Sequence, residues 1–265
     1  MKRGLLIGDL HCGHLMGLTP PDWRDAIRDE YLYEVSQQMW QFFWDSLAKI
    51  GHFDFLIVNG DSVDGRGKKG TEHISTDWEE QRDMFVQCIG MVATKYKIAD
   101  VLIIGGTAFH VETRDGLELE KHGAKDLGAE FGYHEWPQVE GVTFDVKHKI
   151  GGSSIPHGRA TALMKQELWN ALWAEKGTNP RADCFIRSHV HYHIGTTWKR
   201  QNKRKWGFIL PALQGPGSKY GERECEGVVD FGLGYVEVEN GNILKIDTEQ
   251  MEIEGFKKPL IMCED

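Results

Sequence analysis

The stretch LLIGDLHCGH (residues 5–14) decides the fold, because a short apolar run ends in a glycine and polar side chains follow at once. Asp9 and His11 stand one residue apart, directly after Leu5–Ile7. A continuous apolar run that stops at such a turn is typical of a strand buried in a parallel sheet. In an extended segment, residues two apart point the same way, so we expect Asp9 and His11 to face one point.

The same pattern recurs in FDFLIVNGD (residues 53–61) and in VLIIGGT (residues 101–107). Apolar residues at steps of three or four predict a helix over residues 27–50, ended by a glycine, and a second helix over 77–95. Two β-α-β units make the three strands parallel and bring their carboxyl ends to one edge. We therefore expect the polar residues that follow the strands to share one crevice.

The second half of the chain repeats the arrangement with more strands. The sequence predicts a strand over 143–150 that carries His148, a helix over 160–174, and a strand over 184–186 that leads into His189 and His191. Further strands follow, with a hairpin around 201–203, an apolar run at 208–210 and a hairpin that turns at 240–241. This order indicates an α/β protein built as a β-sandwich flanked by helices, with its site at one rim.

Length and composition exclude several classes of protein. A chain of 265 residues without internal repeats is expected to form a single domain, 1–265. Its net charge of −9 argues against a function in which a basic surface binds long nucleic acid. Apolar runs are too short for a membrane span or a signal peptide. Five scattered cysteines without a CxxC pair indicate reduced thiols, so we expect a cytoplasmic protein with no membrane partner.

The polar residues that follow the predicted strands are imidazoles and carboxylates, without a thiolate among them. Such a mixed nitrogen and oxygen donor set suits first-row divalent metals. Each residue also has a duller interpretation, because a lone histidine is usually a packing residue and an aspartate after a strand is often a helix N-cap. The metal interpretation depends on the whole set lying together: Asp9, His11, Asp61, Thr107, His110, His148, His189 and His191.

This set resembles the calcineurin-like metallophosphoesterases, whose blocks are D-x-H, G-D-x-x-D-[RG], G-N-H-[ED], a lone His and G-H-x-H. Here the blocks read GDLHCGH (8–14), GDSVDG (60–65), GGTAFH (105–110), KH (147–148) and SHVH (188–191). The resemblance covers roughly residues 4–193. It implies a four-layer α-β-β-α sandwich with the site at the C-terminal ends of the strands.

The resemblance also implies two divalent metal ions, among which we consider manganese, iron, zinc and nickel and expect manganese. Asp9, His11, Asp61 and His191 would hold one ion, while Asp61, Thr107, His148 and His189 would hold the other, with Asp61 bridging. Two such ions supply a hydroxide near neutral pH for in-line attack on a phosphoester. His110 is the candidate acid or transition-state stabiliser, and Asp64 is the carboxylate expected to orient it.

Two departures from the family pattern concern the third block. Thr107 stands where the family has a metal-ligating Asn, and its hydroxyl is a weaker donor than an amide carbonyl, so reduced affinity for the second ion is expected. His110 follows Thr107 by three residues, whereas the family histidine comes directly after the Asn. The role of Thr107 as a ligand and that of His110 as the catalytic imidazole therefore stay open at this point.

Three functions follow from these residues. The first is a metal-dependent phosphoesterase acting on small phosphoesters, with phosphodiesters preferred to monoesters. The second is a nuclease of the same superfamily that holds DNA or RNA on the basic and aromatic segment 198–206. The third is a non-catalytic metal-binding or scaffolding protein. Trp169 and Trp173 fall on a helical repeat and are expected in the core or on the face of a homo-oligomer.

Overall fold

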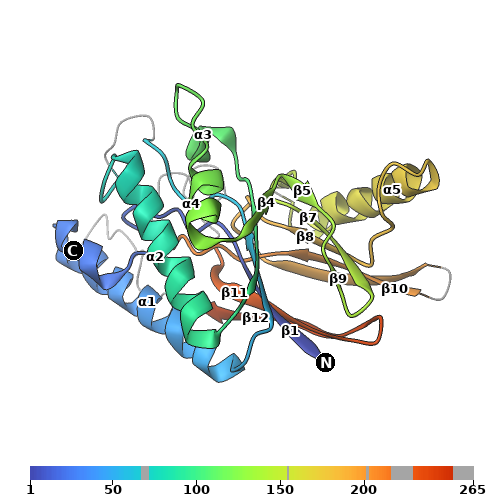
Figure 1. Ribbon diagram of the computed structural model, residues 1–265. Helices are drawn as coiled ribbons and strands as arrows, with labels where there is room; N and C mark the ends of the chain where they lie inside the picture. Colours follow the sequence, from blue (N-terminus) through green and yellow to red (C-terminus); the bar gives the residue numbers. More distant parts are fainter. Residues whose placement is uncertain (67–71, 154, 201–202, 216–228, 253–265) are drawn as a thin grey trace, which may run out of the picture.

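Two mixed β-sheets and flanking helices make up the part of the chain that the computed structural model describes, residues 1–66, 72–153, 155–200, 203–215 and 229–252 (Figure 1). The α/β class predicted from the sequence is confirmed. Within these residues, no helix combines the length and the apolar character that a membrane span requires.

The first sheet has the strand order β12-β11-β1-β2-β3-β4. Strands β1, β2 and β3 are parallel, as the three repeated apolar runs predict. The short strand β4, which was not predicted, is parallel to β3, and β11 and β12 join as an antiparallel hairpin beside β1. The strands span Lys2–Ile7 (β1), Phe55–Asn59 (β2), Asp100–Ile104 (β3), Glu130–Gly132 (β4), Phe231–Glu239 (β11) and Asn242–Met251 (β12). The predicted turn at 240–241 joins the last two strands.

Two long helices connect the parallel strands of this sheet. α1 spans Glu30–Ile50 and ends at Gly51, whose amide donates to Leu47 O. It begins three residues later than the periodicity predicts, because Asp29 caps it and Pro21–Ala26 (η1) forms a separate 3₁₀ turn. α2 spans Trp78–Tyr96, close to the prediction, and the side chain of Asp77 caps its first turn.

The second sheet has the order β5-β7-β8-β10-β9, and β6 also pairs with β7. β7 and β8 are parallel, β8 and β10 are parallel, and β9 forms an antiparallel hairpin with β10. The strands span His134–Glu135 (β5), Gln138–Val139 (β6), Val142–Lys147 (β7), Cys184–Arg187 (β8), Ile194–Arg200 (β9) and Lys203–Ile209 (β10).

Three predictions for this half need correction or completion. The sequence predicts His148 within a strand over 143–150, but β7 ends at Lys147, so His148 is the first residue after the strand. The apolar run at 208–210 is the end of the hairpin strand β10 and does not form a strand of its own. The hairpin is present, although its turn at 201–202 lies outside the described residues.

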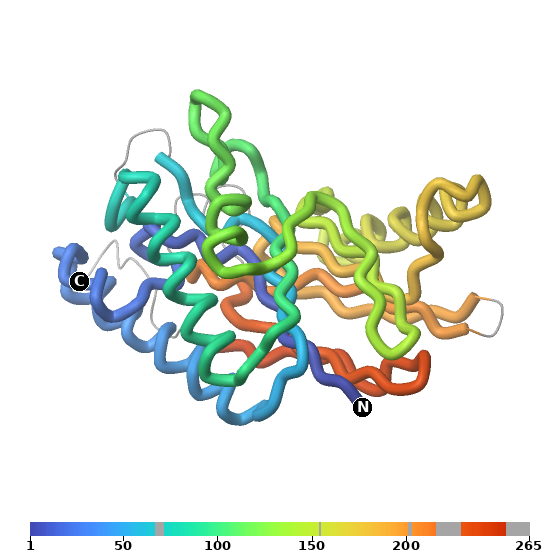
Figure 2. The backbone as a smooth tube through the Cα atoms, in the orientation of Figure 1, coloured from blue at the N-terminus to red at the C-terminus, as the bar shows by residue number. Residues whose placement is uncertain are grey.

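The buried side chains form three clusters that relate the sheets to the helices. Leu5 and Ile7 point to a cluster shared with α1 and α2, whereas Leu6 points to a cluster formed with residues of the second sheet. The third cluster joins Leu163 of α5 (Thr161–Glu175) to Ile209 of β10. Figure 2 shows α1 and α2 side by side at one end of the molecule and α5 at the other.

Two short helices follow β3 and were not predicted. α3 spans Ala108–Val111 and α4 spans Leu119–Leu127. α4 is rich in polar residues, but Leu119 and Ala124 are buried in the same cluster as α2. Among the described cysteines, Cys12, Cys88 and Cys184 are buried free thiols; Cys225 and Cys263 lie outside the described residues.

Candidate metal centre

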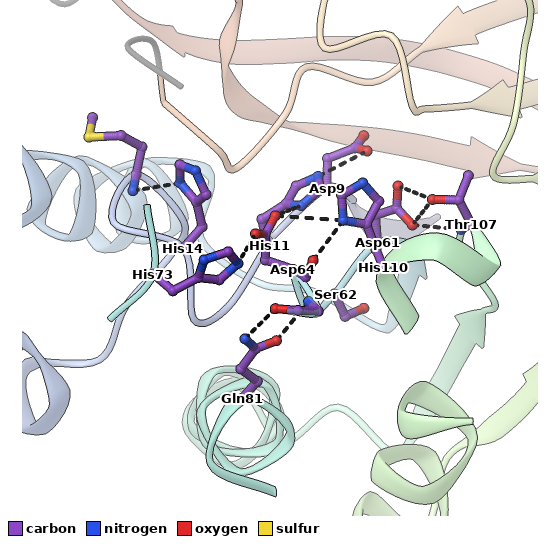
Figure 3. Close-up of polar contacts among 12 residues, drawn as sticks. Asp9, His11, His14, Asp61, Ser62, Asp64, His73, Gln81, Thr107 and His110 are labelled. Carbon is purple, nitrogen blue, oxygen red and sulfur yellow. Dashed lines mark hydrogen bonds and ion pairs between the residues drawn. The ribbon is translucent and has the colours of Figure 1, made fainter. Parts of the chain in front are cut away.

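The predicted site residues follow the carboxyl ends of β1, β2, β3, β7 and β8, which are strands of both sheets. The backbone bonds Asp9 N to Gly60 O (2.9 Å) and His11 N to Asp61 O (3.0 Å), so the first two motifs lie side by side. Ser188 N donates to His148 O (2.8 Å), which joins the fourth motif to the last. All nine residues predicted for the site therefore come together (Figure 3 shows six of them).

The backbone conformation of these motifs differs from the expected one. Asp9 and His11 do not lie in an extended segment, because both have a positive φ, 50° and 45°. The side chains converge because the chain turns sharply after each strand. Left-handed backbone is unfavourable for residues other than glycine and often marks functional sites. Five of the predicted ligands adopt it: Asp9, His11, Asp61, His189 and His191.

One group of donor atoms consists of Asp9, His11 and His191, all buried. Asp9 Oδ1 lies 3.4 Å from His191 Nε2 and 4.0 Å from His11 Nε2. His11 Nδ1 donates to Asp64 Oδ1 (2.8 Å), which leaves a lone pair on the buried Nε2, and this atom makes no hydrogen bond. A buried, unpaired acceptor turned toward a carboxylate fits a metal ligand.

A second group consists of Asp61, His148 and His189. His148 Nε2 lies 2.9 Å from Asp61 Oδ2 and 3.9 Å from Asp9 Oδ1, so it links this group to the first. His148 Nδ1 donates to Asn59 O (2.7 Å), which turns Nε2 toward the carboxylates. His189 Nδ1 lies 3.8 Å from Asp61 Oδ2, and its amide donates to Asp9 (3.0 Å). The two groups thus share one buried pair of aspartates.

Thr107 lies directly on Asp61. Its hydroxyl is 2.9 Å from both carboxylate oxygens, and its amide donates to Asp61 Oδ1 at 2.6 Å. Thr107 is the residue before α3, but its side chain does not cap that helix and bonds Asp61 instead. Thr107 thus lies where the third block of the motif set predicts it. In this structure it donates hydrogen bonds to Asp61, the carboxylate predicted to bridge the two ions.

Asp64 contacts three histidines, in an arrangement that differs from the expected one. Its carboxylate accepts from His11 Nδ1 through Oδ1, and Oδ2 lies 2.7 Å from His73 Nε2 (Figure 3). His110 Nδ1 donates to the backbone carbonyl of Asp64 at 2.8 Å and is 3.7 Å from the carboxylate. Asp64 therefore orients His110 through its main chain and orients His11 through its side chain.

His110 lies at the edge of the cluster, despite its shifted spacing. It belongs to the single turn of α3, and its ring meets that of His11 edge-on with centroids 4.8 Å apart. Its side chain is 22% exposed, against 3% for His11, so it is the more open of the two imidazoles. With Nδ1 bound to a carbonyl, Nε2 is left to act on a group outside the cluster.

The electrostatics of the cluster favour ionised carboxylates. Burial raises the pKa of Asp61, but His148 and the other imidazoles outweigh it and hold this pKa well below its usual range. The same balance, with His191 as the main partner, lowers the pKa of Asp9. Burial lowers the pKa of His11 more than Asp64 raises it, so this imidazole is neutral, as a metal ligand must be.

Three residues that the sequence did not single out support the site. Glu120 of α4 is fully buried and accepts from the amides of Ser62 (2.8 Å) and Gly106 (2.6 Å), the neighbours of Asp61 and Thr107. The side chain of Gln81 in α2 accepts from the amide of Gly65 (2.8 Å) and donates to the carbonyl of Gly65 (2.7 Å). His73 contacts the carboxylate of Asp64 through Nε2. No sequence signal marks Glu120 or Gln81, because acidic and amide side chains on helices rich in polar residues are usually exposed.

The basic segment that motivated the nuclease alternative lies at the turn end of the β9–β10 hairpin. Arg200 pairs with Lys203 at that end, whereas Ile194 pairs with Ile209 at the other, next to the histidine motif. Seven residues of strand separate the ends by roughly 20 Å, and Figure 2 shows the hairpin pointing away from α3. Lys205 is also buried against Asp183 (2.8 Å), so it does not face solvent.

Comparison with known proteins gives structural likenesses alone, since no family model and no curated protein matches this chain. Vps29 from Entamoeba histolytica, solved with Zn²⁺, is 13% identical with a TM-score of 0.45, over 94% of this chain and 98% of Vps29. A Thermotoga maritima protein is 16% identical with a TM-score of 0.38, over 95% and 100%. The sulfate thiohydrolase SoxB from Thermus thermophilus, in complex with glycerol, is 11% identical with a TM-score of 0.42, over 94% and 56%.

Proposed function

We propose that this protein is a metal-dependent phosphoesterase of the calcineurin-like type that hydrolyses phosphodiesters with two divalent ions. The observation that carries the proposal is the position of His148 Nε2, 2.9 Å from Asp61 and 3.9 Å from Asp9, where it joins two groups of metal-binding side chains. Asp9, His11, Asp61 and His191 would hold one ion. Asp61, Thr107, His148 and His189 would hold the other.

The proposed chemistry divides between the ions and the protein. Bound divalent cations would neutralise phosphoryl oxygens and lower the pKa of a water toward roughly 7. The carboxylates of Asp9 and Asp61 stay ionised in the buried site, and Asp64 holds the ring of His11 through Nδ1. His110, oriented by the carbonyl of Asp64, would donate a proton from Nε2 to the leaving alkoxide.

The three carboxylates of the site require bound cations before an anionic ester can approach. Asp9, Asp61 and Asp64 lie together, and no ion pair joins them to a Lys or Arg in the part of the chain that the structure describes. Two divalent cations would outweigh these three negative charges and would attract the phosphoryl oxygens of either kind of ester. A phosphodiester is the substrate class we propose, with manganese as the metal, and the substrate panel below compares it with a monoester.

The proposal includes the finer architecture. We infer a single domain, 1–265, arranged as a four-layer α-β-β-α sandwich, and the three core clusters support these layers. The free thiols of Cys12, Cys88 and Cys184 support a cytoplasmic location. The distance of the basic hairpin from the histidines favours a small phosphoester over nucleic acid, so the nuclease becomes an outcome of the test.

The test combines a metal assay with a substrate panel. The purified protein, supplied with Mn²⁺, is assayed on bis-p-nitrophenyl phosphate, on p-nitrophenyl phosphate, and on single-stranded DNA and RNA. We expect diester hydrolysis that Asp61→Asn abolishes together with metal binding, whereas Asp126→Asn, an exposed carboxylate, changes neither. His110→Asn should lower kcat about 10²–10⁴-fold while metal content stays unchanged.

Other results would contradict the proposal in separable ways. Bound metal without hydrolysis of any ester would support the scaffolding interpretation. Faster cleavage of nucleic acid than of the small diester, weakened by salt and by Lys203→Ala, would favour the nuclease. Absence of bound metal at the concentrations used would refute both the phosphoesterase and the two-ion site.

A further inference from the structure

Helix α5 exposes most of its large apolar side chains to solvent, while its inner face buries two polar residues beside Leu163 and Ala171. The side chains that face outward are 40–53% exposed: Met164, Leu168, Trp169, Leu172 and Trp173. Glu167 and Asn170, by contrast, are buried beneath the helix. A surface helix of a globular protein ordinarily shows the opposite arrangement. The apolar face is therefore not explained by the packing of the chain on itself.

The buried polar residues of α5 have their own partners, so this orientation of the helix is stable. Glu167 pairs with Arg181 (3.2 Å) and with Arg200 (2.8 Å). Asn170 donates to Pro180 O (2.9 Å) and accepts from the amide of Ala182 (3.0 Å). Rotating the helix to bury its apolar face would break these contacts. The outward direction of the tryptophans is thus fixed by the inner face.

The exposed residues form one continuous patch. Met164, Leu168 and Leu172 are spaced by four residues, and the rings of Trp169 and Trp173 stack with centroids 6.3 Å apart. Five half-exposed side chains of this size present on the order of 400–500 Å² of apolar surface. The largest apolar patch on a typical monomer has about this size and is often functional.

We propose that α5 is the interface of a homodimer, in which two copies of the helix pack antiparallel about a two-fold axis at the level of Asn170. The charges of the helix favour this occupant. Lys165 and Glu175, both exposed, lie five residues before and after Asn170, so each lysine would oppose the partner's Glu175. Leu168 would likewise meet the partner's Leu172. A self-complementary patch is what a two-fold interface requires.

The chemistry of the helix fits a second copy better than a membrane. A standard interface buries about 800 Å² on each partner, with an apolar centre and a polar rim. The patch supplies the apolar centre, and Lys165, Glu175 and Lys176 stand at its ends. A membrane-binding helix carries a basic polar face toward the headgroups, whereas the polar face of α5 is turned inward with Glu167 buried.

The first experiment measures the oligomeric state of the full chain by sedimentation velocity at several concentrations. We expect a dimer for the wild type and a rise of at least about 100-fold in the dimer dissociation constant for Leu168→Glu, because the substitution occurs twice at the centre of the interface. Leu244→Glu on β12 is the matched control, since Leu244 is 52% exposed against 53% for Leu168. It should leave the dimer intact, and the circular dichroism spectra of both variants should match that of the wild type, which shows that both fold.

A charge exchange tests the antiparallel geometry. Lys165→Glu and Glu175→Lys should each weaken the dimer, and the double variant should restore it. A wild-type monomer at 100 µM, or a Leu168→Glu variant that dimerises as well as the wild type, would overturn the proposal. The face would then be left to a different protein or to residues 253–265, which lie outside the described structure. None of these results depends on the phosphoesterase proposal.

Discussion

His148 Nε2 lies 2.9 Å from Asp61 Oδ2, and this contact holds a proton that a bound metal ion would displace. Burial lowers the pKa of His148, but the charge of Asp61, with that of Asp9, outweighs it and raises this pKa to about 10. The imidazolium therefore stabilises the metal-free fold below pH 6.5, and this contribution is lost as the pH rises through about 10.

A metal ion needs the neutral ring, so binding at pH 7 displaces this proton. We expect the apparent affinity for Mn²⁺ to rise about tenfold per pH unit between pH 7 and 9. Titration calorimetry in buffers of different ionisation enthalpy should detect the release of at least one proton when Mn²⁺ binds. His148→Gln should release one proton fewer than the wild type. The control His52→Gln alters an exposed histidine and should release the same number as the wild type. An affinity independent of pH over this range would refute the coupling.

Glu120 holds the amides of Ser62 and Gly106, so its replacement should loosen the site without touching a metal ligand. Glu120→Gln keeps one acceptor and sets an NH₂ group against the other amide. Losses of 10–100-fold in metal affinity are typical for residues that support ligands. We expect a loss of this size by metal titration. Glu130→Gln, at an exposed position of β4, is the control, and equal affinities for the two variants would contradict the role.

Thr107 binds Asp61 through a hydroxyl and an amide, and the two contributions can be separated. Thr107→Val removes the hydroxyl and keeps the size and the amide, whereas Thr107→Ser keeps the hydroxyl. We expect Thr107→Val to weaken the second metal ion about tenfold, measured as the dissociation constant of the weaker ion. Retention of both ions by Thr107→Val, as in Thr107→Ser, would show that the hydroxyl contributes nothing.

Asp145 and Arg187 form a buried ion pair (2.6 Å) at the end of β8, directly before the last histidine motif. Burial raises the pKa of Asp145, but His134 and Arg187 outweigh it and hold this pKa below its usual range. The stabilisation is therefore present above about pH 4 and is lost as the pH falls through the lowered pKa.

Asp145→Asn leaves the guanidinium of the fully buried Arg187 without its counter-charge. We expect a loss of about 3–5 kcal/mol in the free energy of unfolding at pH 7. Urea denaturation should show that loss shrinking as the pH falls below 4. Asp83→Asn, which removes an exposed partner of Arg82, should cost less than about 1 kcal/mol. A similar cost for both variants would contradict the prediction.

The strands and helices with strong periodicity could be predicted from the sequence, and the supporting residues could not. β1, β2 and β3 contain continuous apolar runs, and the apolar residues of α1 recur along its whole length. Each pattern involves many residues, so a single atypical residue does not hide it. β5 and β6 have two residues each, which is too short for any period. Glu120 looks like a surface acid because its burial depends on amides from two distant loops.

Eight of the nine candidate site residues were singled out by residue type and order, and Asp64 by the family resemblance, but the way they converge was not predicted. Alternation along a strand was the expected cause for Asp9 and His11, but both residues lie in left-handed turns. Such turns leave no periodic trace in a sequence. The contact of His73 with Asp64 was missed for the same reason, since it joins two irregular segments.

The left-handed turns at Asp9, His11, Asp61, His189 and His191 restrict the donors that could ever replace these residues. Asn, Asp and His are the side chains that best tolerate a positive φ, and they are also oxygen and nitrogen donors. Cysteine or glutamate would supply a donor atom but would pay a main-chain penalty on the order of 1–2 kcal/mol at each position. Redesigning this centre for a softer metal would therefore require rebuilding the turns before exchanging the donors.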